Sequence, residues 1–284
     1  MSPAPPNPLA TLLDRLDLES LDRDLYLGEP EPGGDGPLFG GFVASQATMA
    51  AGRSVERGFL HSLHAYFLRP GRHDLPIRYV VHRIRDGRTF TTRRVVAYQG
   101  GEAIFNLSAS FAQPEEGISH QSPMPEAPPP ESVPDWEDER ARILGDAQRR
   151  PDGAVEVRIC DPDDPTPGVK LPATRRVWMR PRGPLPDDPL LHTALLVYGT
   201  DRTLLGTAAR PHAMPWGRRI GASLDHSVWL HHPPRFEGWV LFTSESPVAH
   251  AARGLIFGAM YDLEGRRIAS VAQEGLIRMP RSEA

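Results

Sequence analysis

The same order of predicted elements occurs twice in this chain, at positions about 160 residues apart. In each copy a helix-like stretch comes before a series of strand-like runs joined by short turns. Ser62-Leu63 in the first copy corresponds to Ser223-Leu224 in the second, and Arg93 corresponds to Arg253. Solenoid repeats have periods of about 20–50 residues, so this longer period indicates a duplicated domain. A length of 284 residues also suits two domains of ordinary size.

Each copy contains one helix that is expected at the centre of its domain. The segment 39–52 is small or apolar on every face, which is typical of a buried helix. It starts with Gly40-Gly41, where the backbone can approach another group closely. The corresponding helix of the second copy covers 188–198. Central helices are therefore predicted to begin near Gly41 and Pro189, and a short amphipathic helix is predicted at 9–18.

The strand-like runs predict an antiparallel meander in each copy. Asp86-Gly87 and Gly100-Gly101 are typical hairpin turns between the runs of the first copy. The runs cover 60–68, 75–84, 89–98 and 102–111 in the first copy and 154–160, 175–180, 222–230, 239–246, 251–261 and 268–277 in the second. One buried helix with a meander around it, present twice, indicates an α+β fold.

Proline marks the boundary between the two copies. The chain has 31 prolines, and proline removes a backbone donor, so most must lie in loops. They cluster within 113–134, which predicts a linker, and the charged stretch that follows predicts a surface helix over 135–150. We therefore expect an N-terminal domain at 1–112, a proline-rich linker at 113–134 and a C-terminal domain at 135–284.

Composition excludes several classes of protein. With a net charge of −4, the chain lacks the basic field that would hold nucleic acid. Its N-terminus lacks the basic start and apolar core of a signal peptide, and no stretch approaches the roughly 18 apolar residues of a membrane span. A cytoplasmic protein is expected. Cys160 is the single cysteine and lies in an apolar run, where packing is expected rather than reactivity.

Local motifs do not indicate a function. Asp225-His226-Ser227 contains the residue types of a hydrolase triad, but in a strand His226 would point away from both neighbours. The sequence has no Gly-x-Ser-x-Gly elbow, dinucleotide fingerprint or phosphate loop. His61 and His64, like His231 and His232, lack the accompanying carboxylates of a metal site. Neither a metal nor a cofactor is expected.

Longer segments carry a family resemblance, and they span roughly residues 20 to 279. They are Leu38-Phe39-Gly40-Gly41, residues 61–71, residues 85–90, Arg93-Arg94-Val95, Tyr198-Gly199-Thr200-Asp201, residues 224–229 and Gln273-Glu274-Gly275. In order and spacing they resemble the TesB-like acyl-CoA thioesterases, also called acyl-CoA thioesterase II. The resemblance implies a double hotdog fold, with two tandem hotdog domains that each wrap an antiparallel sheet around a long helix. It also implies hydrolysis of acyl-CoA to a free fatty acid and CoA.

The resemblance further implies one catalytic site. The family places an aspartate after the second hotdog helix, a threonine or serine in the next strand and a glutamine in the last strand. By position these residues are Asp201, Ser223 and Gln273, although threonine is more common than serine in the family. The three side chains are expected to converge on a water, with Asp201 as its base or main acceptor. The first copy has Ser62 in place of Ser223 and, in place of Gln273, Ala109 or a near neighbour and no glutamine, so one site per chain is expected.

Substrate binding is expected at Gly40, Gly41 and Phe42. Backbone N–H groups at the glycine-marked helix start would polarise the thioester carbonyl. The family usually has glutamine after the paired glycines, whereas this chain has Phe42, whose ring would either wall an acyl tunnel or pack between the two hotdogs. The expected partners are an acyl-CoA substrate and further copies of the same chain, in a homodimer or higher homo-oligomer.

Two other functions remain open on the sequence alone. A non-catalytic acyl-CoA-binding relative would keep the fold without turnover, and Phe42 leaves room for it. A hotdog hydratase or dehydratase would need a catalytic histidine paired with a carboxylate, and the sequence shows no such pair in a helix-and-loop context. The presence of Asp201, Ser223 and Gln273 together favours the thioesterase.

Overall fold

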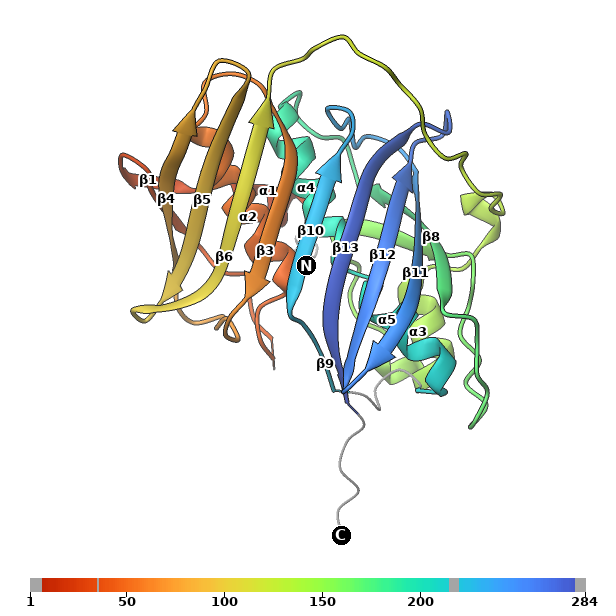
Figure 1. Ribbon diagram of the computed structural model, residues 1–284. Coiled ribbons are helices and arrows are strands. Elements are labelled where there is room, and N and C mark those ends of the chain that lie inside the picture. Colours follow the sequence, from red (N-terminus) through yellow and green to blue (C-terminus); the bar gives the residue numbers. More distant parts are fainter. Residues whose placement is uncertain (1–6, 35, 215–219, 279–284) are drawn as a thin grey trace, which may run out of the picture.

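A large antiparallel sheet and two long helices form most of the fold (Figure 1). The computed structural model describes residues 7–34, 36–214 and 220–278. Within them the α-helices are α1 (Pro8–Leu16), α2 (Gly40–Arg53), α3 (Trp136–Leu144), α4 (Pro189–Thr200) and α5 (Leu204–Ala209). The strands are β1 (Glu19–Asp22), β2 (Leu25–Gly28), β3 (Phe59–Phe67), β4 (Ile77–Asp86), β5 (Phe90–Gln99), β6 (Glu102–Ala112), β7 (Val155–Ile159), β8 (Thr174–Pro181), β9 (Ile220–Ser223), β10 (Asp225–Leu230), β11 (Val240–His250), β12 (Arg253–Tyr261) and β13 (Arg267–Arg278).

The strand order confirms the duplication. In the first half the order across the sheet is β2-β4-β5-β6-β3, and α2 connects β2 to β3 along the chain. In the second half the order is β8-β11-β12-β13-β10, and α4 lies between β8 and β10 in sequence. Each half therefore has the same strand order with the long helix in the same connection, and the predicted double hotdog fold is confirmed.

The two half-sheets join edge to edge, which the sequence did not indicate. Strand β3 of the first half pairs antiparallel with β10 of the second, with Ala65 opposite His226 and Leu63 opposite Val228. This pairing makes one 13-stranded sheet from the described strands. Because β10 also pairs with β13, the seam between the halves runs directly beside the last strand of the second half.

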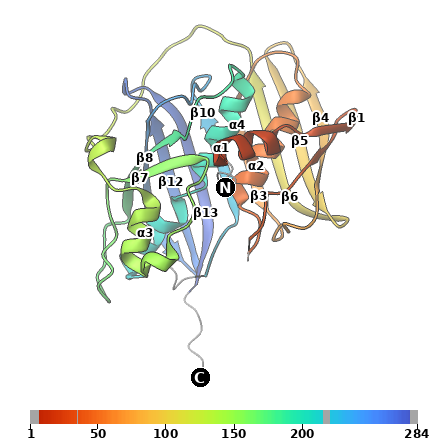
Figure 2. The same ribbon diagram turned by 180° about the vertical axis from the view of Figure 1, so that it is seen from behind.

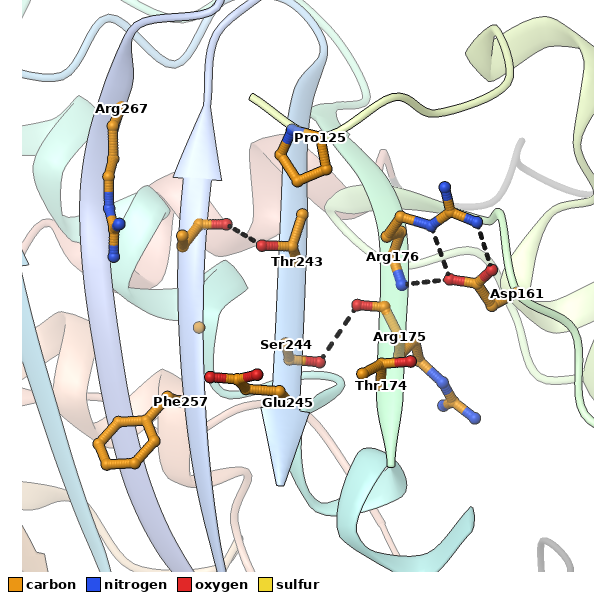
Figure 3. A pocket seen from close by; sticks show the side chains of 12 residues that line it. Pro125, Asp161, Thr174, Arg175, Arg176, Thr243, Ser244, Glu245, Phe257 and Arg267 are labelled. Atoms are coloured by element: carbon orange, nitrogen blue, oxygen red, sulfur yellow. Dashed lines mark hydrogen bonds and ion pairs between the residues drawn. The ribbon is translucent and has the colours of Figure 1, made fainter. Parts of the chain in front are cut away.

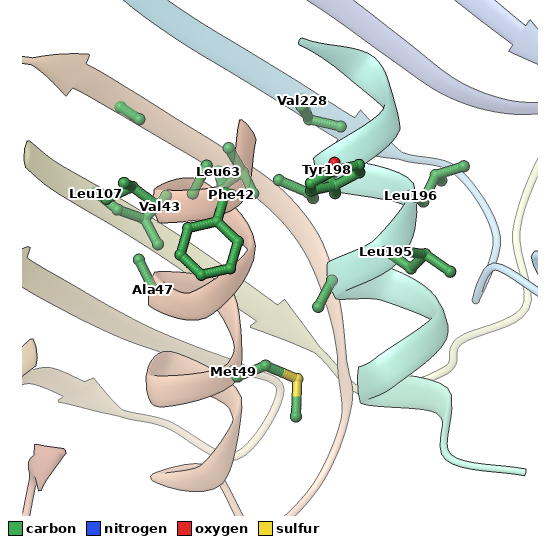
Figure 4. Close-up of a cluster of buried hydrophobic side chains, with 14 of the residues drawn as sticks. Phe42, Val43, Ala47, Met49, Leu63, Leu107, Leu195, Leu196, Tyr198 and Val228 are labelled. Atoms are coloured by element: carbon green, nitrogen blue, oxygen red, sulfur yellow. The ribbon is translucent and has the colours of Figure 1, made fainter. Parts of the chain in front are cut away.

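Helices α2 and α4 lie side by side on one face of this sheet (Figures 2 and 4). They run in opposite directions, since Gly41 at the start of α2 lies against Tyr198 near the end of α4, and Gly52 near the end of α2 lies against Leu190. Twelve of the fourteen residues of α2 are buried. A continuous apolar core surrounds the two helices, and the predicted starting points near Gly41 and Pro189 are confirmed.

Helix α4 begins at a well-defined signal. The Asp188 side chain accepts hydrogen bonds from the N–H groups of Leu190 and Leu191, and Pro189 occupies the first helical position, where its missing N–H costs nothing. Ten of the twelve helical residues are buried. The polar cap fixes the start of α4, and burial fixes the rest of the helix in the core. The position of its other end, which carries Asp201, is therefore also fixed.

The proline-rich segment lies across the outer face of the second half-sheet, away from α2 and α4. The carbonyl of Pro128 accepts a hydrogen bond from Trp178 Nε1 at 2.8 Å, and the carbonyl of Glu126 accepts one from Arg176. Beneath the segment lies a small apolar cluster, built from Trp178, Trp239, Leu241, Ala259 and Tyr261. The domain boundaries at 112 and 134 stay a prediction.

Several elements differ from the sequence prediction. The single strand predicted over 222–230 is wrong, because the structure interrupts it at Leu224 between β9 and β10. The short strands β1 and β2 and the short helix α5 were not predicted. None of the described helices combines the length and apolar character that crossing a membrane requires.

Candidate active site

Asp201 stands at the junction of the two central helices. It caps the end of α4 and is 8% exposed. A backbone hydrogen bond from Gly41, in the first turn of α2, lowers the pKa of the Asp201 carboxyl. The start of a helix carries partial positive charge, and the end of one carries partial negative charge. The start of α2 therefore offsets the unfavourable position of a carboxylate at the end of α4.

The paired glycines allow this close approach. A methyl group at Gly40 would lie 2.8 Å from Asp201 Oδ2 and 2.6 Å from the Phe67 ring. A methyl group at Gly41 would lie 2.7 Å from the carbonyl oxygen of Tyr198. All three distances are too short for a Cβ atom, so glycine at these positions lets the first turn of α2 reach Asp201.

A local irregularity brings Ser223 to the same place. Ser223 pairs with Gly275 in β9–β13, but Ser227 pairs with Ala272 in β10–β13, so the register shifts by one residue between them. At the shift, the Asp225 side chain accepts the Glu274 N–H at 2.7 Å. A bulge of this kind re-aims side chains. Ser223 and His226 are three positions apart and would face opposite sides of a regular strand, yet here both reach Gln273.

The three residues that the family resemblance implied are in direct contact. Ser223 Oγ donates to Asp201 Oδ1 at 2.9 Å, and Gln273 Nε2 donates to Ser223 Oγ at 2.8 Å. Gln273 is fully buried and Ser223 is partly exposed. The structure thus brings Asp201, Ser223 and Gln273 together from the end of α4, from β9 and from β13.

The electrostatics of the site favour a basic carboxylate. Burial raises the pKa of Asp201 above its ordinary value of 3.8, and the neighbouring His226 and the hydrogen bonds from Ser223, Gln273 and the Gly41 backbone oppose this rise. Desolvation is the largest of these effects. A carboxylate with a raised pKa is a stronger base, which suits the removal of a proton from water.

His226 belongs to the site, and the sequence did not indicate this. It is fully buried, its Nδ1 lies 2.6 Å from Gln273 Oε1 and its Nε2 lies 2.8 Å from Thr200 Oγ1. Its neighbours in sequence point elsewhere, since Ser227 bonds to His64 and Asp225 bonds to the backbone of Glu274. The expectation that Asp225-His226-Ser227 is not a triad is confirmed. To predict the contact between His226 and Gln273 from the sequence, one would need to know the register between β10 and β13.

Phe42 lies beside the site but inside the core. It is fully buried and packs among apolar side chains of the central helices and the sheet (Figure 4). Its neighbour Gly41 makes the backbone hydrogen bond to Asp201. Gly40 and Gly41 both lie in the first turn of α2, where backbone N–H groups have no acceptor within the helix.

Glu31 lies close to the start of α2 as well. The charges of His73 and Arg202 and a backbone hydrogen bond from Phe39, the residue that precedes the helix, each lower the pKa of the Glu31 carboxyl. Burial nevertheless raises the pKa of Glu31 to about 7, because desolvation is larger than these effects. A titratable group therefore anchors the segment that leads into the site.

Other chemically active groups lie away from this site. A pocket of about 440 Å³ on the outer face of the second half-sheet is lined by polar residues such as Arg176, Thr243 and Arg267, with the helices behind the strands (Figure 3). Arg176 is already paired with Asp161 there. Cys160 packs against the apolar cluster on this face, as expected, and burial raises the pKa of its thiol to about 11. Among the residues that the structure describes, no cluster of histidine, cysteine or carboxylate side chains is arranged to hold a metal ion.

Comparison with known proteins identifies relatives over nearly the whole chain. Residues 29–112 match the family described as acyl-CoA thioesterase N-terminal domain, and residues 149–276 match the family described as acyl-CoA thioesterase. Acyl-coenzyme A thioesterase 8 of Mus musculus is 38% identical, over 93% of this chain and 88% of its own length. Acyl-CoA thioesterase 2 of Haemophilus influenzae is 37% identical, over 95% of this chain and 98% of its own length.

A solved structure agrees with these relatives. The crystal structure of the acyl-CoA thioesterase II TesB2 from Mycobacterium marinum is 41% identical, covers 95% of this chain and 99% of its own chain, and superposes with a TM-score of 0.79. Sequence identity and fold thus agree over both halves. The chain therefore belongs to the TesB-like acyl-CoA thioesterase II family of thioester hydrolases.

Proposed function

We propose that Asp201, Ser223 and Gln273 form the catalytic site with which this chain hydrolyses acyl-CoA to a free fatty acid and CoA. The observation that carries the proposal is the pair of hydrogen bonds from Gln273 to Ser223 and from Ser223 to Asp201, made by residues from three separate elements. The raised pKa of the Asp201 carboxyl supports its role as a base.

In the proposed reaction a water molecule attacks the thioester carbonyl. The carboxylate of Asp201 takes one proton from the water, and the water oxygen forms a bond to the carbonyl carbon. The carbonyl oxygen becomes an oxyanion, and the carbon–sulfur bond then breaks as the carbonyl re-forms. CoA leaves as a thiolate, and because a thiol has a pKa of about 8.5, its departure needs no strong acid. The proton held by Asp201 passes to the products or to solvent.

Ser223 and Gln273 act by position. Ser223 occupies Oδ1 of Asp201, so the water is expected at Oδ2, the oxygen that faces Gly40. Ser223 and the second N–H of Gln273 would limit how this water can turn. Positioning of a reactant in this way can supply several kcal/mol of the barrier, with an upper range of about 7–11 kcal/mol for ideal alignment.

The start of α2 is the proposed binding site for the thioester. The N–H of Gly40 would donate to the carbonyl oxygen, while Gly41 holds Asp201. Phe42 contributes from the core as packing beneath this turn. One site per chain is proposed, because the first half has Ser62 and Ala109 where the second has Ser223 and Gln273. The homo-oligomer and the cytoplasmic location stay predictions.

Thiol release from palmitoyl-CoA tests the proposal. Purified protein should release free CoA, detected with a thiol reagent, at a rate that saturates with substrate and is proportional to protein concentration. Calorimetric titration with a non-hydrolysable palmitoyl-CoA thioether, run beside the assay, distinguishes the alternative. Binding without thiol release across short, medium and long acyl chains would identify a non-catalytic acyl-CoA-binding protein and would reject the proposal.

A further inference from the structure

Hydrogen bonds join Thr200, His226, Gln273, Ser223 and Asp201 into one chain. Thr200 Oγ1 lies 2.8 Å from His226 Nε2, and His226 Nδ1 lies 2.6 Å from Gln273 Oε1. Gln273 Nε2 lies 2.8 Å from Ser223 Oγ, which in turn lies 2.9 Å from Asp201 Oδ1. Thr200, His226 and Gln273 are fully buried, so each donor among these three side chains must face an acceptor within the protein.

The carboxylate of Asp201 determines which group donates in each of these hydrogen bonds. An ionised carboxylate only accepts hydrogen bonds, so the single O–H of Ser223 must donate its hydrogen bond to Asp201. The Ser223 oxygen must then accept a hydrogen bond from Gln273. The Gln273 N–H therefore faces Ser223, and the Gln273 carbonyl oxygen faces His226. A carbonyl oxygen cannot donate, and Nδ1 of His226 must therefore carry a proton.

Thr200 accommodates either charge state of His226. Its hydroxyl has one proton and two neighbours that can accept it, the Val197 carbonyl oxygen at 2.7 Å and His226 Nε2 at 2.8 Å. When His226 is neutral, its Nε2 carries no proton and accepts a hydrogen bond from the Thr200 hydroxyl. Doubly protonated His226 donates from Nε2, and Thr200 then donates to Val197. In both states the Nδ1 proton faces Gln273.

We propose that His226 is a positioning residue that holds the Gln273 amide with its N–H toward Ser223. The inference rests on the proposed function, since it explains how the Asp201–Ser223–Gln273 site keeps its geometry. Without the Nδ1 donor the amide can turn by 180° and place its oxygen against Ser223. Asp201 and Gln273 would then compete for one hydroxyl proton, and Ser223 would no longer be held on Asp201. His226 acts through Gln273, because Gln273 and Ser223 lie between it and Asp201.

Nuclear magnetic resonance of the imidazole nitrogens tests the proton position without measuring activity. The protein is labelled with ¹⁵N-histidine, and the His226 signals are assigned by their loss in His226→Asn. We expect His226 to carry a proton on Nδ1, either alone or together with one on Nε2. A proton on Nε2 alone would mean that the Gln273 amide is turned the other way, and it would overturn the inference while leaving the roles of Asp201 and Ser223 intact.

A pair of variants tests the consequence for catalysis. His226→Asn keeps an N–H donor near the position of Nδ1, whereas His226→Phe keeps the ring volume and removes the donor. We expect His226→Phe to lower kcat about 10- to 100-fold with little change in KM, and His226→Asn to recover most of that loss. His192→Phe is the matched control, because His192 lies near the start of α4, at the opposite end from Asp201, is also buried, and accepts the backbone N–H of Phe236 at its Nδ1. It should lower the melting temperature and keep kcat.

Equal kcat values for His226→Phe and His226→Asn, or an unchanged kcat in His226→Phe, would show that the donor does not position Gln273. The failure of the proposed function is a separate result. It would appear as full turnover in a variant of Asp201, whatever the behaviour of the His226 variants.

Discussion

Ser223 donates its hydroxyl proton to Oδ1 of Asp201 across 2.9 Å, although the two residues belong to different elements and are 22 positions apart in sequence. The register against β13 shifts by one residue between β9, which carries Ser223, and β10. The geometry requires a hydroxyl at this position and does not require a nucleophile there.

Replacement of Ser223 separates positioning from covalent catalysis. Ser223→Thr keeps the hydroxyl and should keep most of the activity. Ser223→Ala should lower kcat about 10- to 150-fold, the equivalent of a hydrogen bond to a charged group worth about 1.5–3 kcal/mol. Intact-protein mass spectrometry after rapid quenching with palmitoyl-CoA should show no acylated wild-type protein. An acyl adduct on Ser223 would replace the water mechanism with an acyl-enzyme.

The pH dependence of kcat/KM should report the buried Asp201. The base must be ionised, so activity should be lost as the pH falls through the pKa of Asp201, and burial places that pKa above 3.8. The Ser223 hydrogen bond lowers this pKa. In Ser223→Ala the acid limb should therefore move to higher pH than in the wild type. A limb at the same or lower pH in this variant would show that another group controls it.

Glu31 should make the stability of the fold depend on pH. Its pKa is raised from 4.5 to about 7 in the folded protein, so the folded state holds the proton more tightly than the unfolded state. The stability that this proton contributes is fully present below about pH 4.5 and is lost as the pH rises through about 7. Urea denaturation should show the wild type losing stability relative to Glu31→Gln over this interval. A difference between the two proteins that stays constant from pH 4.5 to 8 would contradict the raised pKa.

Phe42 is expected to act on stability and not on chain-length selectivity. Because Phe42 is fully buried in the core, Phe42→Gln should lower the free energy of unfolding by about 3–5 kcal/mol, the scale for loss of a buried aromatic side chain. The ratio of kcat/KM for palmitoyl-CoA to that for a short-chain acyl-CoA should not change. Phe42→Leu, which keeps the position apolar, serves as the control. A changed ratio in both variants would mean that the ring walls the acyl tunnel.

Local sequence patterns were sufficient for much of the fold. The small-residue helix after Gly40-Gly41 and the capped helix after Asp188 lie where they were predicted, because burial on every face and a proline after a capping aspartate are local signals. The short strands β1 and β2 give no such signal. Four exposed residues in β1 lack the alternation that marks a half-buried strand.

The site was accessible only in part from the sequence. The family resemblance implied Asp201, Ser223 and Gln273, and they converge. The sequence predicts that a regular strand turns His226 away from its neighbours, and this is correct for Asp225 and Ser227. Its partner is Gln273, 47 positions further along the chain, and only the register between β10 and β13 brings the two together. The joining of the half-sheets through β3 and β10 depends on pairing of the same long-range kind.

The turnover of Asp201→Asn is the most direct test of the proposed site. Asparagine keeps the size of the side chain and removes the base, so kcat for palmitoyl-CoA hydrolysis should fall by about 10²–10⁴-fold, the usual contribution of a positioned general base. Circular dichroism and binding of the non-hydrolysable thioether should stay close to those of the wild type. Turnover by Asp201→Asn at the wild-type rate would contradict the account, because no other carboxylate takes part in the hydrogen-bond chain that joins Ser223 and Gln273 among the described residues.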